Sequence, residues 1–172
     1  MRFVDNSVVI EDGKRKIKIC QDPLHILKNN IQKNKKQHES GGILIGRENL
    51  SNNNLIIEYI TKPLLEDTRN GTRFYRKDKG HVRFYNDIYD KYGGIHFYVG
   101  EWHTHPEAIP QFSLMDVRNW GKIGKEFGKE KTQIHIIVGY SALSIWEFSF
   151  LHKTTRRIAT IFWNEVSISE EN

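Results

Sequence analysis

Alternating apolar and polar residues near the start of the chain predict a β-hairpin. Apolar residues at 8–10 and within 14–19 lie on either side of Asp12-Gly13, a dipeptide typical of tight two-residue turns. The alternation within each run places one side of each strand toward a core. We therefore expect the first structural unit to be a pair of antiparallel strands.

A helix is expected to follow this hairpin. Asp22 is a good N-cap residue, and Pro23 is favoured at the first helical position, where its missing N–H costs nothing. Leu24, Leu27 and Ile31 recur at helical spacing and would face the core. The pair Gly41-Gly42 then breaks the pattern ahead of the next apolar run.

The remaining pattern predicts further strands, two more helices and one long loop. The helix at 81–92 would bury Val82, Tyr85, Ile88, Tyr89 and Tyr92, and a helix from Ser113 would bury Leu114, Val117, Trp120 and Phe127. Residues 62–80 are polar and contain two glycines, which favours a loop. Short apolar runs predict strands at 43–45, 55–60, 97–99, 134–140, 143–150 and 158–163.

This order of elements indicates an α/β fold, a sandwich in which helices flank a central mixed sheet. No repeat or linker divides the sequence, so we expect one domain over residues 1–172. With 38% hydrophobic and 27% charged residues, the composition is that of a globular soluble protein. The chain has no apolar run long enough to cross a bilayer and no signal-peptide pattern, which predicts a cytoplasmic protein.

Charge and cysteine content narrow the function classes. The formal net charge of +5 comes from residues spread along the chain, which favours a solvated surface over a nucleic-acid-binding patch. Cys20 is the only cysteine, so an internal disulfide and a cysteine-based zinc site are both excluded. Since it ends an apolar-alternating run, we interpret Cys20 as a small core residue rather than a nucleophile.

The segment from His103 to Asp116 carries the strongest chemical signal. His103 and His105 are two apart on a predicted strand, so both imidazoles would point to the same face. Asp116 lies in the first turn of the next helix, where the intervening loop can bring it back to the histidines. Two histidines and one carboxylate leave a tetrahedral position for water, the pattern of a catalytic zinc site. The segment therefore predicts one Zn²⁺ per chain.

A zinc-activated water also needs a nearby proton acceptor that does not bind the metal. The helical His-Glu-x-x-His motif is absent, so this group must come from elsewhere in the chain. Glu39, just before Gly41-Gly42, is our candidate, because glycines allow a close backbone approach. A simpler alternative exists for part of the pattern: Ser113 and Asp116 also form a capping box for their helix.

At these two segments the sequence resembles the JAMM (MPN-plus) metalloprotease family. The resemblance rests on residues 39–46 and on residues 103–106 through 113–116, and the order of elements extends it over most of the chain. It implies an MPN-like fold with zinc bound by His103, His105 and Asp116. It further implies that Glu39 moves the proton of the zinc-activated water and that Ser113 donates a hydrogen bond to the oxyanion.

The resemblance also indicates substrates. Family members remove ubiquitin or ubiquitin-like proteins, and this chain is most similar to small peptidases of bacterial antiphage (CBASS) operons. It implies an isopeptidase whose protein substrate carries a conjugated C-terminal tail. The implied partners are a ubiquitin-transfer-like conjugating enzyme and a nucleotidyltransferase. Residues 106–112 are too few for the zinc-carrying insertion of some eukaryotic deubiquitinases, so their linkage preferences do not carry over.

Three alternatives stay open at the level of sequence. The enzyme could process a sulfur-carrier protein, the domain could be a non-catalytic scaffold, or it could bind nucleic acid, which the spread of charge disfavours. The segment 62–80 is either a mobile surface loop or a substrate contact. In the second case Arg69, Arg73, Phe74 and Tyr75 would hold an extended tail near the metal.

Overall fold

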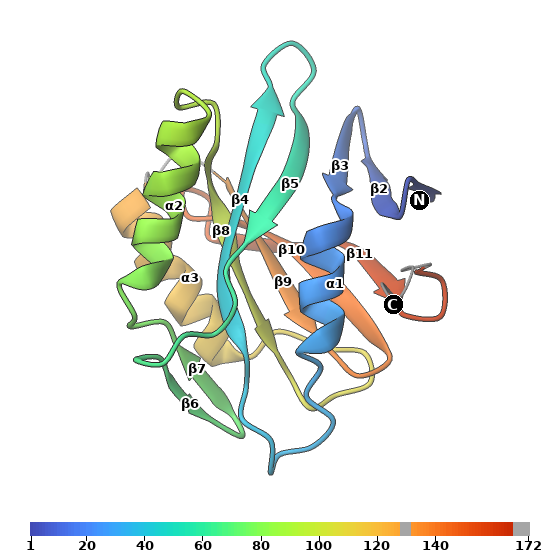
Figure 1. Cartoon of the computed structure of the whole chain (residues 1–172). Coiled ribbons are helices and arrows are strands. Elements are labelled where there is room, and N and C mark those ends of the chain that lie inside the picture. The colour runs from blue at the N-terminus through green and yellow to red at the C-terminus, as the bar shows by residue number, and fades with distance from the viewer. Residues whose placement is uncertain (128–131, 167–172) are drawn as a thin grey trace.

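The computed structural model describes residues 1–127 and 132–166. Within them, nine strands form one curled sheet in the order β1-β2-β3-β5-β4-β8-β9-β10-β11, and β6 and β7 form a separate hairpin (Figure 1). The strands are β1 (Arg2–Val4), β2 (Ser7–Asp12), β3 (Arg15–Ile19), β4 (Gly41–Asn49), β5 (Asn54–Ile60), β6 (Thr68–Asn70), β7 (Arg73–Tyr75), β8 (Phe97–Thr104), β9 (Thr132–Val138), β10 (Ala142–Ser149) and β11 (Thr154–Phe162). The helices are α1 (Gln21–Asn29), α2 (Gly80–Lys91) and α3 (Leu114–Phe127).

The predicted α/β fold with a mixed central sheet is confirmed. β3 pairs with β5 and β8 with β9 in parallel, while the other neighbouring strands are antiparallel. The hairpin expected from Asp12-Gly13 is β2–β3, in which Ile10 is opposite Ile17. Gly13 has a φ of +62°, the left-handed conformation that glycine adopts most readily in such turns.

Both faces of the central strands are buried, and this decides where the helices lie. Leu44 belongs to the main core with Leu24 and Leu27 of α1, whereas Ile43 and Ile45 pack with Ile88 of α2 on the opposite face. α1 lies on one side of the sheet and α2 and α3 on the other (Figure 1). Strands covered on both faces carry continuous apolar runs, as residues 43–45 do.

The first helix begins one residue before the predicted N-cap. α1 starts at Gln21 with Cys20 as N-cap, and no side chain caps it. Asp22 and Pro23 instead occupy the first turn, where a carboxylate favours the helix dipole and a missing N–H costs nothing. Leu24 and Leu27 are fully buried as predicted, and Ile31, just beyond the helix, packs partly against the same core.

The strand predicted at 43–45 is longer than expected: β4 begins at Gly41, so the glycines expected to interrupt the pattern ahead of it are its first two residues. A Cβ atom at Gly41 would lie 2.4 Å from the Phe74 ring, and one at Gly42 would lie 2.3 Å from the Thr61 carbonyl oxygen. These glycines therefore allow the Phe74 ring and the Thr61 backbone to lie close to β4.

The segment 62–80 is not wholly a loop. It contains the β6–β7 hairpin, with Thr68 opposite Tyr75 and Asn70 opposite Arg73. A two-stranded hairpin is marginal by itself in water, so contacts with distant residues must stabilise it. Such contacts leave no periodic signal, which is why the sequence pattern predicted a loop.

The second helix buries a narrower stripe than predicted. His81 and Ile88 are buried, and Tyr85 and Tyr92 pack against the same cluster. Val82 and Tyr89 were expected inside, but they are 51% and 44% exposed. Positions 81, 85, 88 and 92 form one line along a helix, and residues one position away lie on its flank.

The third helix confirms two of its predicted core positions. Trp120 is 3% exposed and Val117 packs beside it, whereas Leu114, at the first helical position, is 78% exposed. The side chain of Phe127 lies outside the described part of the chain. The last strand starts at Thr154, four residues before the predicted 158, because it pairs with β10 along its length. None of the described helices is long and apolar enough to span a membrane.

Candidate metal centre

The two histidines lie at the end of β8, on the face that carries α3. Trp102 and His103 are opposite Ile136 and Ile137 of β9. Because successive side chains alternate, Trp102 enters the main core with Ile136, and His103 points to the other face with Ile137. His105 continues on the face of His103, and its N–H donates to the Val138 carbonyl at 2.9 Å.

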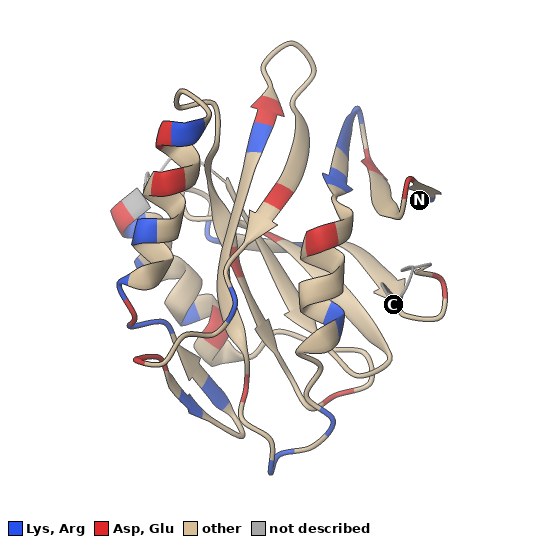
Figure 2. Cartoon of the chain, viewed as in Figure 1, with Lys and Arg blue, Asp and Glu red and all other residues tan. Residues whose placement is uncertain are grey.

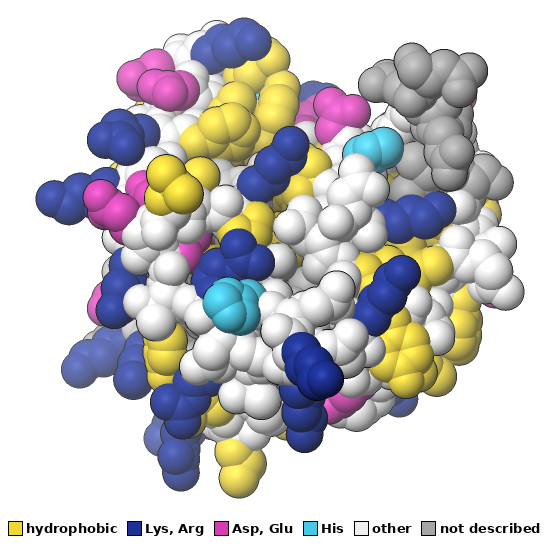
Figure 3. Space-filling model, turned by 60° about the horizontal axis from the view of Figure 1, so that its bottom comes forward, with side chains coloured by type: hydrophobic (Ala, Val, Ile, Leu, Met, Phe, Trp, Pro, Cys, Tyr) yellow, Lys and Arg dark blue, Asp and Glu magenta, His cyan; other side chains and the backbone are white. Residues whose placement is uncertain are grey.

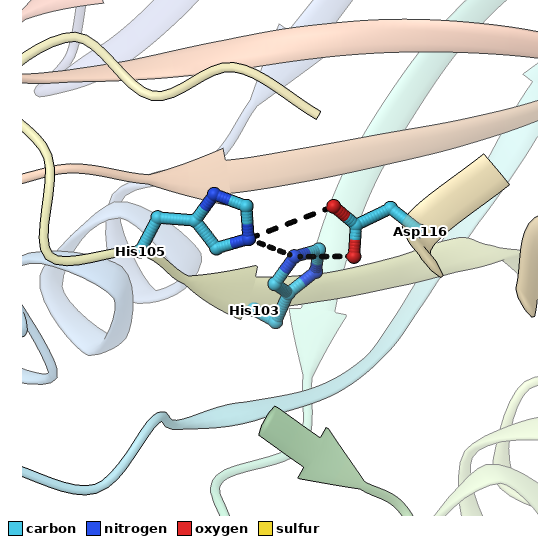
Figure 4. A group of neighbouring side chains, drawn as sticks. All are labelled: His103, His105 and Asp116. Carbon is cyan, nitrogen blue, oxygen red and sulfur yellow. Dashed lines mark hydrogen bonds and ion pairs between the residues drawn. The ribbon is translucent and has the colours of Figure 1, made fainter. Parts of the chain in front are cut away.

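Asp116 completes a compact group with these histidines (Figure 4). Its Oδ1 lies 3.2 Å from His103 Nε2, and its Oδ2 lies 3.6 Å from His105 Nε2. The two Nε2 atoms are 3.0 Å apart. The structure thus brings together the three residues that the sequence predicted as metal ligands, from a strand end and a helix start.

These distances fit a single bound cation. Ligand atoms about 2.0–2.1 Å from a tetrahedral zinc ion lie about 3.3 Å from one another. The two Nε2 atoms are 3.0 Å apart, and each has one Asp116 oxygen nearby, Oδ1 at 3.2 Å from His103 and Oδ2 at 3.6 Å from His105. Two imidazole nitrogens and one carboxylate also match the ligands that zinc prefers, whereas magnesium and calcium prefer oxygen alone. His103, His105 and Asp116 can therefore hold zinc.

The capping interaction and the ligand group involve the same carboxylate. Ser113 donates to Asp116 Oδ2 from its backbone N–H at 2.6 Å and from its Oγ at 2.7 Å. The Asp116 N–H in turn donates to Ser113 Oγ at 3.2 Å. The cap therefore orients the carboxylate toward the histidines, so the two interpretations of Ser113 and Asp116 are compatible.

The Asp116 carboxylate and burial shift the pKa values of the two histidines in opposite directions. Burial opposes the charged form of His103, but its hydrogen bond to Asp116 raises the pKa of His103 above the usual value. Burial and the neighbouring His103 lower the pKa of His105 to about 4. Despite burial, the hydrogen bonds from His103 and Ser113 lower the pKa of Asp116. The group thus pairs an ionised carboxylate with one neutral imidazole, both of which can bind a cation.

Glu39 lies in the same cleft as these three residues. Gly41 is opposite His103 in the β4–β8 pair, and alternation places Glu39 on the same face as Gly41. The Glu39 side chain is buried, with 4% of the residue exposed. Burial raises the pKa of Glu39 to about 7, although His103 opposes the shift. A bound cation would favour its ionised form.

Hydrogen bonds on the opposite face of β4 and β8 fix the backbone next to Glu39 and His103. The Ser40 N–H donates to Thr104 Oγ1 at 2.9 Å, and the Thr104 N–H donates to the Ser40 carbonyl at 2.9 Å. Thr104 Oγ1 also donates to Gln32 Oε1 at 3.3 Å, and both residues are buried. The residues that follow Glu39 and His103 are therefore joined directly.

The cleft is narrow and one wall is the β6–β7 hairpin. It holds about 60 Å³ of space for solvent, enough for a few water molecules. Of the predicted substrate contacts, Arg73, Phe74 and Tyr75 line it, whereas Arg69 instead donates to the Glu39 carbonyl. Thr72 also lines this wall and was not predicted.

Basic residues surround this part of the molecule. Figure 2 shows Lys and Arg on the β6–β7 hairpin and on the loop that follows α1. On the face turned forward in Figure 3, basic side chains are more widespread than acidic ones. We define the basic rim as the exposed Lys33, Lys35, Lys36 and Arg73. The uniform charge of the rim favours an acidic approaching surface.

Sequence reasoning missed a stacked pair beside the metal centre. The Trp120 ring, predicted only as core, lies 4.4 Å from the His135 ring at an interplanar angle of 10°, and Trp120 also lines the cleft. Burial lowers the pKa of His135 to about 3, so this ring stays neutral beside His103. Cys20 does not line the cleft, and burial raises the pKa of its thiol, which disfavours a nucleophilic role.

Comparison with protein families shows to which family the chain belongs. Residues 28–152 match the family described as prokaryotic homologs of the JAB domain, which is most of the sequence and includes both segments of the cleft. The chain belongs to this family. The resemblance to the JAMM family that the two motifs carry is thereby confirmed.

Three curated relatives share the name CD-NTase/cGAS isopeptidase. The Escherichia coli (strain TW11681) protein is 35% identical over 68% of this chain and 74% of its own length. The Vibrio cholerae (strain N16961) protein is 32% identical over 72% of each chain. The Pseudomonas aeruginosa (strain Pa011) protein is 28% identical over 84% of this chain and 90% of its own.

A solved structure supports the fold alone. A protein from Desulfitobacterium hafniense, determined in solution, matches with a TM-score of 0.57 at 14% identity. The match covers 81% of this chain and 87% of the other. At this identity the likeness extends to the arrangement of the sheet and helices and not to chemistry.

Proposed function

We propose that the protein is a zinc-dependent isopeptidase that releases the C-terminus of a CD-NTase-type nucleotidyltransferase from the group to which it is conjugated. One observation carries the proposal: three side chains that could hold a metal ion present ligand atoms within 4.8 Å of one another, in a cleft that also contains a buried glutamate. The family and the names of the relatives support the reaction class and the substrate.

In this proposal His103, His105 and Asp116 hold the metal. Zinc, when bound, acidifies its water and polarises the scissile carbonyl. The Ser113 cap keeps the Asp116 carboxylate turned toward the histidines through two hydrogen bonds. The neutral His105 ring presents Nε2 to the same point, 3.6 Å from Asp116 Oδ2.

Glu39 would act as the general acid/base. Its burial and raised pKa suit a carboxyl group that accepts a proton at one step and returns it to the leaving amine at another. It lines the cleft without belonging to the metal-binding group. A carboxylate bound to the metal would be a weaker proton acceptor, because the positive charge of the ion favours its ionised form.

Ser113 would stabilise the oxyanion with its hydroxyl. The Ser113 Oγ lines the cleft, and its proton is directed at Asp116 Oδ2, 2.7 Å away. Because the Ser113 backbone N–H also bonds Oδ2, the hydroxyl can turn toward a substrate oxygen without leaving the carboxylate unbonded.

The substrate tail would enter the cleft in an extended form. With only about 60 Å³ of space for solvent, the cleft is too narrow for a folded domain, so the substrate would reach it as an extended segment. The Phe74 and Tyr75 rings and the Arg73 side chain line its outer wall and are available for contact. A ubiquitin-transfer-like conjugating enzyme is the proposed source of the conjugate.

The test is cleavage of a purified conjugate in which a CD-NTase C-terminus is joined to a lysine side chain. Chelation of the metal should abolish release of the free C-terminus, and stoichiometric zinc should restore it. The matched variants are Glu39→Gln and Glu66→Gln, since Glu66 is exposed and outside the cleft. Release that persists without metal, or that survives Glu39→Gln unchanged, would refute the proposed reaction.

A further inference from the structure

The peptide groups of Glu39 are bonded to the β6–β7 hairpin through both their N–H and their carbonyl. The Glu39 N–H donates to the Asn70 carbonyl at 2.8 Å, and Arg69 Nε donates to the Glu39 carbonyl at 2.6 Å. Arg69 Nη2 also donates to Ser40 Oγ at 2.9 Å. One guanidinium therefore holds two consecutive residues, beginning with the proposed base.

Arg69 itself stays out of the substrate path. The residues that line the cleft from this hairpin are Thr72, Arg73, Phe74 and Tyr75, and Arg69 is not among them. The donors Nε and Nη2 both act within the protein, on Glu39 and Ser40. We therefore expect Arg69 to affect the reaction through Glu39 and Ser40.

The hairpin has other anchors, so it does not depend on Arg69 for its position. Arg76 Nε donates to Glu101 Oε1 of β8 at 2.7 Å, and Gln32 Nε2 donates to the Gly71 carbonyl at 3.0 Å. Asp67 accepts hydrogen bonds from the backbone of Leu64, Lys77 and Asp78 and lies 2.9 Å from His81 Nε2 of α2. Removal of the Arg69 side chain should therefore leave the hairpin folded and release the Glu39 carbonyl and the Ser40 hydroxyl, while the bond from the Glu39 N–H to Asn70 remains.

We propose that Arg69 is a positioning residue for the proposed base Glu39. The inference rests on the proposed function. Proton transfer requires the carboxylate to be within about 2.6–3.2 Å of the group it serves. Glu39 lies just before β4, where its own strand does not yet hold it. Bonds from the hairpin to its N–H and carbonyl restrict the backbone from which the carboxylate projects.

Arginine suits this task better than lysine. Its planar fork presents Nε and Nη2 in a fixed relation, which matches two acceptors on adjacent residues. A lysine ammonium is a single point on a flexible stem and cannot hold both acceptors with the same geometry. Arg69→Lys should therefore restore only part of the effect.

The experiment compares Arg69→Ala and Arg69→Lys with Lys77→Ala. Lys77 provides a matched control, because it is an exposed cation of the same segment and it donates to Asp67 Oδ1 from its backbone N–H. We expect Arg69→Ala to lower kcat by about tenfold or more, with KM within about twofold and zinc content unchanged. Arg69→Lys should be intermediate, Lys77→Ala should match wild type, and added guanidinium ion should partly restore Arg69→Ala.

Two results would overturn the inference. One is an unchanged kcat in Arg69→Ala. The other is a raised KM with kcat preserved, which would make Arg69 a substrate contact. A wild type that cleaves nothing would refute the proposed function instead. In that case amide hydrogen exchange still tests the role of Arg69. Faster exchange at Glu39 in Arg69→Ala than in Lys77→Ala supports Arg69 as a positioning residue, and equal exchange contradicts this role.

Discussion

The two sides of the cleft are built on different kinds of support. His103 lies at the end of β8, a strand inside the nine-stranded sheet, and His105 directly follows it. Asp116 lies in the first turn of α3, whose Trp120 is 3% exposed. Glu39 precedes its strand and is held by bonds to a hairpin outside that sheet. The proposed metal side is thus fixed by the core, and the proposed base side by a peripheral element, so mutation should separate metal binding from turnover.

Removal of a histidine from the metal side should have the largest effect. We expect His103→Ala to lose zinc and all measurable cleavage, because two ligands bind the ion far more weakly than three. Elemental mass spectrometry of the purified protein measures this directly. His152→Ala is the control, since His152 is exposed and outside the cleft. Full zinc occupancy in His103→Ala would remove His103 from the ligand set.

Substitution of Glu39 should greatly reduce turnover without loss of the metal. Glu39→Gln keeps the size of the side chain but removes its proton-accepting oxygen, so we expect turnover to fall by about 10²–10⁴-fold. Zinc content and the free energy of unfolding should stay near those of wild type. Substantial residual cleavage would show that another group accepts the proton.

Ser113 connects the two sides, because it both orients Asp116 and faces the cleft. Ser113→Ala should slow cleavage by about 100-fold through the lost oxyanion donor. It should also reduce the free energy of unfolding by about 1 kcal/mol through the lost cap. Ser113→Thr keeps a hydroxyl and serves as control. A normal rate with reduced stability would leave Ser113 a cap alone.

Gly41→Ala tests the contact between the hairpin and β4. The added Cβ would lie 2.4 Å from the Phe74 ring and 2.7 Å from the Trp102 carbonyl oxygen, so the Phe74 ring and the backbone of β4 or β8 must shift. We expect kcat/KM to fall by about tenfold and the free energy of unfolding to fall by about 1–3 kcal/mol, with zinc retained. Chemical denaturation of Gly41→Ala, Phe74→Ala and the double variant measures the coupling. Simple additivity would mean that Phe74 is not the obstacle.

The basic rim should have the smallest effect. If it attracts an acidic approaching surface, kcat/KM should fall a few-fold as salt rises through about 0.1 M, where the screening length is about 10 Å. Lys35→Glu should flatten this dependence, and kcat should not change in either case. Cleavage that is insensitive to salt would show that the rim takes no part in substrate approach.

Much of the fold followed from local pattern. The β2–β3 hairpin, the buried run at 43–45 and the core positions of α1 are set by periodicity and turn chemistry over a few residues. The misplaced features depend on distant partners instead. Gly41 and Gly42 were expected to interrupt the pattern ahead of the strand, but they belong to it, and the Phe74 ring and the Thr61 backbone occupy the space beside them. No window of local sequence contains both members of such a contact.

The sequence by itself determined the chemical identity of the cleft: two histidines on one strand face, a carboxylate in a first helical turn, and a glutamate before two glycines. The placement of each of these residues follows from rules that act within one helix or strand, or within one connection. Only the tertiary structure decided that Gly41 lies opposite His103, that the β6–β7 hairpin forms a wall of the cleft, and that Arg69 bonds the Glu39 carbonyl. These contacts join residues about 30 to 60 positions apart, and their register depends on how sheet and helices pack as a whole.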